Sequence, residues 1–522
     1  MGDMNIECEI CGGYSFTNEQ GRSKNSCCHG GKIILKNLTS YPPDLEKLLK
    51  GTDDRSKNFR QNIRIYNNAF AFASFNAKNA DIAGRGPYCM RIVGEAYKLA
   101  TTSLISKGNP RFGQIYIYDD NETVTYRTNS KISDDLLLYL QTTLRNNPYA
   151  ESFRYLNDVF KENKDESVSL NFVSYCNDDQ RRYNVPTSNA IAAIIATRDG
   201  SIPDAVDVKV FPKNKNAYDF LSNLSQHSDP MLFPLLFPNG DNGWSYQMKT
   251  TNGKNVSPLQ YYSFRLTPRN GQFNQVLCSG RLTQQYIINC YLTIESQRLK
   301  YLRYNQDQIR SECYQGLVDH VSNCSANNPE NVRLGNVLIL PSSFQGSSRA
   351  MQQLYQDAMA ISRKVGRPDL FITMTCNPNW PEIRRYLKSL PNGLTANDIP
   401  YFTCRLFHQK VLSLIADLQN VFGAIRAYVY TIEFQKRGLP HMHLLVTLQS
   451  KLLTADHIDE FISAEIPDKS QFPKLWYKVI RHMLHGPHEN SLPCYDKNTN
   501  LCSKKFPKEF IDNTDMRGTG FP

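Results

Sequence analysis

Residues 433–445 have the sequence EFQKRGLPHMHLL, and our prediction of the fold starts from this stretch. It contains two histidines, His441 and His443, which are separated by one residue and lie within an apolar run. On a β-strand, residues two apart point to the same face and lie about 7 Å from each other along the chain. On a helix the same pair would diverge by about 200°. The apolar flanks and the turn residue Gly438 favour the strand, with both imidazoles on one face and Met442 pointing into a core.

Two imidazoles on one strand face can share a divalent metal ion, and the third ligand is then expected from the preceding strand. Glu433 fits this position if the hairpin has the correct register, because a slip of one residue would turn its side chain to the other face. Gln435 is the alternative oxygen ligand. Two histidines and one oxygen ligand with open positions suit Mg²⁺ or Mn²⁺ in phosphodiester chemistry. The competing interpretation of a short His-x-His motif is a pair of histidines on a solvated strand face.

The segments around the motif predict an α+β domain. Residues 369–375 form a β-rich run, and a helix is expected over 403–420. Strands follow over 427–435 and 441–448, and a further helix over 454–465. The order strand, helix, strand, strand favours an antiparallel sheet with packed helices.

Upstream of this domain the pattern is helical. Apolar residues recur at three- and four-residue steps from residue 281 to about residue 321. A second helix is expected over 348–364, capped by Ser347 or Ser348 and closed by Gly366. Further towards the N-terminus, residues 114–118 (QIYIY) have the composition of a strand.

A cluster of thiols near the start of the chain predicts a zinc site. Cys8 and Cys11 form a Cys-x₂-Cys pair, and Cys27, Cys28 and His29 follow, so five candidates compete for four positions. We expect Cys8, Cys11 and Cys28 to bind, with Cys27 or His29 as the fourth ligand. The alternative is a set of buried thiols without metal.

A second zinc site is predicted near the end of the sequence. Its ligands would be His485, His488, Cys494 and Cys502, and His482 is a competitor for one of the four positions. The alternative is a set of unlinked surface residues.

Composition sets broad limits on the class of protein. The 522 residues correspond to two to four domains, and the formal charge of +11 is compatible with nucleic-acid binding without demonstrating it. No stretch reaches the roughly 18 apolar residues of a membrane helix, and the first residues lack the apolar core of a signal peptide. We therefore expect a soluble protein of the nucleus or cytoplasm, without a membrane partner.

The motif stretch resembles the HUH motif of Helitron transposases, which are rolling-circle transposon proteins. Residues 371–383 (FITMTCNPNWPEI) likewise resemble the first Rep motif of that family. The N-terminal cysteine module also resembles the family's, and shorter matches occur in family order at residues 233–238 (FPLLFP), 281–286 (RLTQQY), 340–344 (LPSSF), 357–359 (DAM) and 367–371 (RPDLF).

The resemblance implies an order of domains along the chain. The expected parts are a zinc-binding module (1–45), an N-terminal α+β region without an assigned role (46–215), a helical connecting region (216–345), an HUH Rep endonuclease-like core (346–470) and a His/Cys zinc-binding extension (471–522).

The resemblance also implies an activity, the nicking and strand transfer of single-stranded DNA at transposon ends. In the family, a divalent metal polarises the scissile phosphate and a tyrosine attacks it to form a 5′-phosphotyrosine link. His441 and His443 would then be metal ligands, with Glu433 or Gln435 completing the site. The residues expected to contact DNA or to orient the ligands are Thr373, Thr375, Asn377, Lys436 and Arg437, and the aromatic candidates for base stacking are Trp380, Tyr428 and Tyr430.

One part of the family pattern is missing from the sequence. Paired tyrosines are expected downstream of the HUH motif, whereas Tyr477 and Tyr495 are the only tyrosines after His443. The phosphate-binding loop of the helicase that follows in intact elements is also absent. We therefore expect a C-terminally truncated protein that binds metal and DNA, and three functions remain open: an endonuclease domain, a non-catalytic DNA-binding remnant, or a hydrolase that uses metal-bound water.

Overall fold

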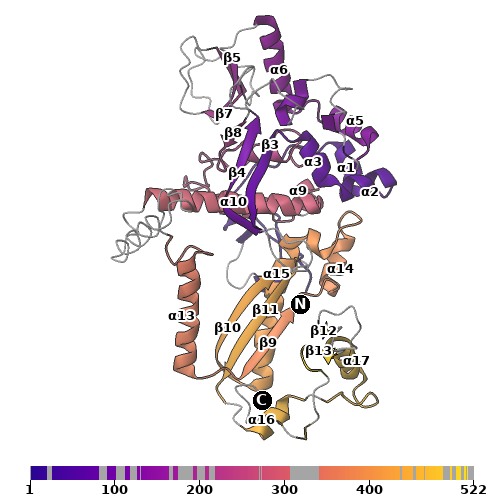
Figure 1. Cartoon of the computed structure of the whole chain (residues 1–522), viewed down its shortest axis with the longest axis vertical. Helices are drawn as coiled ribbons and strands as arrows, with labels where there is room; N and C mark the ends of the chain where they lie inside the picture. Colours follow the sequence, from indigo (N-terminus) through magenta and orange to yellow (C-terminus); the bar gives the residue numbers. More distant parts are fainter. Residues whose placement is uncertain are drawn as a thin grey trace. The chain divides into compact units, whose positions relative to one another are not determined.

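The protein has a mixed α+β fold, mostly helical, with small antiparallel sheets (Figure 1). It is described by a computed structural model. The residues that the structure describes are 2–19, 26–80, 91–101, 112–117, 126–127, 129, 131–163, 168–173, 192–196, 206–210, 218–269, 271, 273–305, 340–435, 438–450, 454–463, 465–485, 494–496, 501–506, 511–512 and 514.

The chain forms two compact units, each assembled from segments that are distant in sequence. The first unit contains Met1–Tyr355, Met374–Ile415 and Ile432–Met442. The second contains Gln356–Thr373, Ala416–Thr431 and His443–Pro522. None of the described helices is long and apolar enough to cross a membrane.

The large core of the first unit lies around three helices and a three-stranded sheet. The helices are α1 (Pro43–Lys50), α2 (Asp54–Gln61) and α3 (Ile63–Phe70). The strands are β3 (Ala73–Ala80), β4 (Arg91–Thr101) and β8 (Tyr218–Leu221), in the order β3-β4-β8 with antiparallel pairing. The apolar segment 233–238 supplies Phe233, Leu235, Leu236 and Phe237 to this core, directly after the short helix α7 (Ser228–Leu232).

The prediction of a strand at residues 114–118 is wrong for residues 114–117, and Tyr118 lies outside the described residues. Residues Phe112–Ile117 form a 3₁₀ helix, η3. Ile115 is buried and the neighbouring Tyr116 also packs against the core, with its ring 4.6 Å from that of Phe72. Tyr116 therefore contributes its ring to this core from a 3₁₀ helix rather than from a strand.

Helices and a second small sheet complete the upstream half of the first unit. They are α5 (Asp134–Thr143), α6 (Pro148–Asn163), α8 (Pro258–Arg265), α9 (Gln275–Cys278), and β5 (Val168–Val173), β6 (Ala192–Ala196) and β7 (Val206–Val210) in the order β6-β5-β7. Helix α8 begins with a capping box between Ser257 and Gln260, which satisfies backbone N–H groups at its start.

The two long helices predicted upstream of the motif are present. Helix α10 spans Arg281–Tyr304, and the rest of the predicted range, 306–321, lies outside the described residues. Helix α13 spans Ser348–Val365. The hydroxyl of Ser347 accepts the N–H of Ala350, so Ser347 is the cap, and Gly366 ends the helix with φ of +91°.

The predicted antiparallel sheet is also present and has the order β10-β11-β9, with β11 in the centre (Figure 1). The strands are β9 (Leu370–Thr375), β10 (Ile425–Phe434) and β11 (Pro440–Leu448). The Gln435 N–H donates to the Leu439 carbonyl where β10 turns into β11. On the other side of β11, the backbone N–H of Asp369 donates to the carbonyl of Val446, and that of Cys376 donates to the carbonyl of Pro440. The partner number falls as the donor number rises, which is an antiparallel pattern.

Helices and small hairpins flank this sheet in sequence. They are α14 (Pro381–Lys388), η4 (Ala396–Asp398), α15 (Pro400–Phe422), α16 (Ala455–Phe461), α17 (Pro473–His482) and the hairpin β12 (Tyr495–Asp496) with β13 (Leu501–Cys502). Helices α15 and α16 confirm the two predicted at 403–420 and 454–465. At the other end of the chain lie β1 (Ile6–Glu7), β2 (Tyr14–Ser15), η1 (Thr17–Glu19) and η2 (Ser26–Cys28). Cys8 and Cys11 lie between β1 and β2, and Cys27 and Cys28 belong to η2.

Candidate metal centres

Strand β11 separates its side chains into an apolar face and a polar face. Met442, Leu444 and Val446 are each 0% exposed, and they alternate with His441 and His443. His441 is 8% exposed and His443 is half-buried. Both imidazoles therefore occupy one side of the strand, because the apolar residues between them are held in the core.

The carboxylate of Glu433 converges with the two imidazoles. One ligand atom from each of Glu433, His441 and His443 lies within 4.8 Å of the other two. Glu433 is exposed near the end of β10, in the hairpin whose other strand carries the histidines. The backbone N–H of Gln435, the alternative ligand, closes this hairpin by donating to the Leu439 carbonyl. Its role as a metal ligand remains a prediction.

A hydroxyl on the neighbouring strand holds one of the imidazoles. Thr375 Oγ1 of β9 lies 2.8 Å from Nδ1 of His441. With Nδ1 protonated, it donates to this hydroxyl and leaves Nε2 as the lone-pair nitrogen for a metal. Partners of this kind set the tautomer and the ring orientation of metal-binding histidines.

The second imidazole packs against an aromatic ring that the sequence analysis did not single out. The ring of Phe371 is parallel to that of His443, with an interplanar angle of 0° and 5.7 Å between centroids. Phe371, Thr373 and Thr375 alternate along β9, so they share one face of the strand. The alternation along β9 could be read from the sequence, and it predicts that Phe371 shares a face with the two threonines. It could not predict that Phe371 packs against His443, because that contact depends on how β9 pairs with β11.

The donor set could hold a metal ion. Two imidazoles and one carboxylate supply three ligand atoms that converge from the two strands of one hairpin. Glu433, which is exposed, also supplies a carboxylate beside the buried His441 and the half-buried His443.

Four cysteines near the N-terminus form a compact group. The sulfur atoms of Cys8, Cys11, Cys27 and Cys28 lie within 4.8 Å of one another. The Sγ atoms of Cys8 and Cys28 are 3.9 Å apart, and those of Cys11 and Cys27 are 3.3 Å apart. Tetrahedral zinc with Zn–S bonds of about 2.3 Å places sulfur atoms roughly 3.8 Å apart, so this group is compatible with zinc binding.

The structure brings Cys27, and not His29, into this group. His29 is exposed and follows Cys28 with a positive φ of 50°, and the group of converging ligand atoms does not include it. Burial raises the pKa of Cys28 to about 11, and burial beside neighbouring thiols raises the pKa of Cys27 as well. A bound cation would favour the thiolate form of these two cysteines.

A second group of ligands lies near the C-terminal end of the sequence. Ligand atoms of His485, Cys494 and Cys502 converge within 4.8 Å, and Nε2 of His485 is 3.3 Å from Sγ of Cys502. Burial raises the pKa of the Cys502 thiol, but hydrogen bonds from the backbone N–H groups of Phe506 and Lys504 outweigh it and lower the pKa overall. His488, the predicted fourth ligand, lies outside the described residues.

The residues predicted to contact DNA have different environments. Thr373 and Asn377 are exposed, and the Asn377 side chain accepts the N–H of Asn379. Lys436 and Arg437 lie outside the described residues.

The aromatic candidates also differ from one another. Tyr428 is exposed and its ring stacks on that of Tyr430, with centroids 6.3 Å apart. Trp380 instead packs on Phe407, and Lys410 lies over its ring. Its ring is therefore already occupied by the protein.

Comparison with protein families identifies the central part of the chain. A family model described as the Helitron helicase-like domain at the N-terminus matches residues 261–446, from helix α8 to strand β11. No curated protein matches the chain. The chain therefore contains a Helitron helicase-like N-terminal domain, as expected for a protein derived from a Helitron transposon, and such a domain suggests DNA as a partner.

Proposed function

We propose that this protein binds single-stranded DNA and a divalent metal ion on the β9–β11 sheet, for nicking and strand transfer of the HUH type. The observation that carries the proposal is the convergence of Glu433, His441 and His443 within 4.8 Å. The match to a Helitron helicase-like domain over residues 261–446 supports the choice of DNA as the substrate.

Each residue at the sheet would have a separate role. His441, His443 and Glu433 would hold Mg²⁺ or Mn²⁺, which when bound supplies Lewis-acid polarisation of the scissile phosphate. Thr375 would hold the His441 ring through Nδ1, and Phe371 would fix the plane of His443. Thr373, exposed between them on β9, would contact the DNA backbone.

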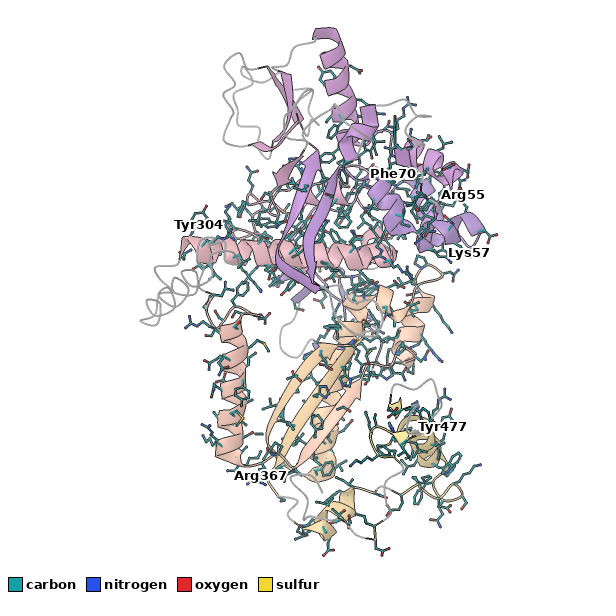
Figure 2. All side chains as sticks on the ribbon, in the orientation of Figure 1. Arg55, Lys57, Phe70, Tyr304, Arg367 and Tyr477 are labelled. Atoms are coloured by element: carbon teal, nitrogen blue, oxygen red, sulfur yellow. The ribbon has the colours of Figure 1, made fainter. Side chains whose placement is uncertain are left out.

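The cleavage step needs a tyrosine nucleophile. Its Oη forms a bond to phosphorus, the bond from phosphorus to the 3′ oxygen breaks, and that oxygen takes up the phenol proton. Tyr477 is exposed on α17, where its Oη accepts a hydrogen bond from Arg481, and Tyr495 begins β12 (Figure 2). Within the printed sequence they are not spaced as a Tyr-x-x-x-Tyr pair. For this stretch of chain the second candidate function is therefore DNA binding without cleavage.

A single gel experiment separates these functions. The protein is incubated with end-labelled single-stranded DNA and Mn²⁺, and the products are separated under denaturing conditions. A labelled protein–DNA adduct would establish tyrosine-dependent nicking, and a free nick without adduct would indicate hydrolysis by metal-bound water. Intact DNA that the protein nevertheless binds would establish the non-catalytic function.

The metal assignment has its own test. His441→Ala should abolish Mn²⁺ binding at the sheet and leave the zinc content unchanged, because the cysteine groups do not involve this residue. His457→Ala on α16 is the matched control, since His457 is exposed and outside the ligand groups. Equal Mn²⁺ affinity in the His441 variant and the wild type would overturn the proposed site.

A further inference from the structure

Two neighbouring cavities in the first unit share lining residues at the start of helix α10, and together they are called the groove below. Their volumes are about 930 and 690 Å³, and both are lined by Arg281, Gln284 and Ile288. The larger cavity extends to Phe434 and Gly438, at the end of the hairpin that carries Glu433 and His441. The smaller one extends to Arg64 on α3.

The groove has a strongly unequal charge. Four cationic side chains line it, Lys57, Arg60, Arg64 and Arg281, against one carboxylate, that of Asp398. Asp398 is already engaged, since it accepts hydrogen bonds from Thr395 and Gln284. The net charge of the lining is therefore positive along its length.

The four cationic side chains differ in the hydrogen bonds and ion pairs that they form within the protein. Arg60 Nη1 donates to the carbonyls of Leu48, Leu49 and Gly51, which anchors its guanidinium in place. Lys57 projects from α2 and pairs with Asp54 in an exposed ion pair, which contributes little (Figure 2).

The other two cations are open to a ligand. Arg64 and Arg281 are exposed, and within the described part of the chain neither forms an ion pair. Arg281 lines both cavities, so it is placed where the two parts of the groove meet.

Apolar side chains lie among these cations. Phe434 is 62% exposed and Ile288 is 47% exposed. Cations that follow a backbone, combined with an exposed aromatic ring on which a base can stack, are the pattern of single-strand binding. A duplex keeps its bases stacked inside and offers no free base face to Phe434.

We infer that this groove binds the backbone of single-stranded DNA and leads it to the hairpin of the metal site. The inference rests on the proposed function for the identity of the ligand, but it concerns residues that are separate from the metal ligands. Phosphates would pair with Arg64 and Arg281, and an unpaired base would stack on Phe434. None of these residues was singled out from the sequence as a DNA contact.

The test is the affinity for a fluorescent oligothymidylate, measured by anisotropy in EDTA so that the metal site does not contribute. The double variant Arg64→Glu/Arg281→Glu should bind roughly tenfold more weakly, as expected for lost charge-assisted contacts. Its salt dependence should fall by about 0.7 in slope for each lost phosphate contact. Glutamate in the first turn of α10 suits the helix dipole, so Arg281→Glu should not weaken the helix.

The matched control is Arg298→Glu, an exposed arginine on the same helix α10 but outside both cavities, which should bind like the wild type. Equal losses in the groove variant and the control, or no loss in either, would overturn the groove. Competition by a duplex as effective as that by an unlabelled single strand would also overturn it.

The outcome is separable from that of the proposed function. In the absence of DNA, Arg64→Glu/Arg281→Glu should keep Mn²⁺ binding, because neither arginine belongs to the ligand group, whereas His441→Ala should lose it. Failure of the groove variant to weaken binding leaves the metal assignment intact, whereas failure of the His441 variant to lose Mn²⁺ leaves the groove intact.

Discussion

Thr375 Oγ1 lies 2.8 Å from Nδ1 of His441, and this hydrogen bond connects strand β9 to the candidate metal ligand on β11. It occupies the imidazole nitrogen that a metal would not use and so leaves Nε2 for coordination. Removing the hydroxyl should free the ring to rotate without changing the ligand set.

This relationship predicts the behaviour of two variants. Thr375→Val should lower Mn²⁺ affinity by about tenfold, the lower end of the range measured for such supporting contacts. Thr375→Ser keeps the hydroxyl and should restore most of the affinity. Calorimetric titration with Mn²⁺ measures both, and equal affinities for the valine and serine variants would contradict a positioning role.

The cysteine group predicts which side chains hold zinc. Cys28→Ser and Cys27→Ser should each lower the zinc content by about one ion per chain, because each removes one of four tetrahedral ligands. His29→Ala should retain the full content, since His29 is outside the group. Elemental analysis of the purified proteins gives the stoichiometry, and the reverse ranking of Cys27 and His29 would show that histidine is the fourth ligand.

The buried face of β11 predicts a difference in stability between two positions of one strand. Met442 is 0% exposed, so Met442→Ala should lower the free energy of unfolding by about 2–5 kcal/mol through lost contacts and the cavity left behind. Leu445 is 39% exposed on the opposite face, and Leu445→Ala should cost much less. Urea denaturation measures both, and similar losses would show that the two faces are equally buried.

Lys98 predicts a dependence of stability on pH. This lysine is fully buried beside Asp229, and burial lowers its pKa from 10.5 to about 8. Between pH 8 and 10.5 the unfolded chain therefore holds more protons than the folded one at this position, so the contribution of Lys98 to the free energy of unfolding should rise with pH. The contribution of one group is at most about 1.4 kcal/mol per pH unit.

The variant Lys98→Met isolates this contribution. It should remove this contribution, so the free energy of unfolding should increase less with pH between pH 8 and 9.5 than it does in the wild type. Urea denaturation at each pH measures the difference. Asp229 keeps hydrogen bonds from Tyr262, Tyr286 and Asn289 in the variant, so it retains partners there. Identical pH profiles for the two proteins would contradict the lowered pKa of Lys98.

The sequence by itself determined the features that depend on neighbours along the chain. The period of two in residues 440–448 was enough to place both imidazoles on one face and Met442 in the core, because side chains of a strand alternate whatever lies around it. A helix cap at Ser347 or Ser348 and the glycine end at Gly366 were predictable for the same reason, since caps act within a few residues, and the structure selects Ser347.

Only the tertiary structure decided the features that join distant segments. The register of the β10–β11 hairpin brings the Glu433 carboxylate to the histidines, and the pairing of β9 with β11 brings Thr375 and Phe371 to them. The described residues of the strand-like run at 114–118 belong to the 3₁₀ helix Phe112–Ile117, from which Tyr116 packs against the core. Register and packing depend on contacts between residues far apart in sequence, and a local pattern contains no information about which of these contacts form.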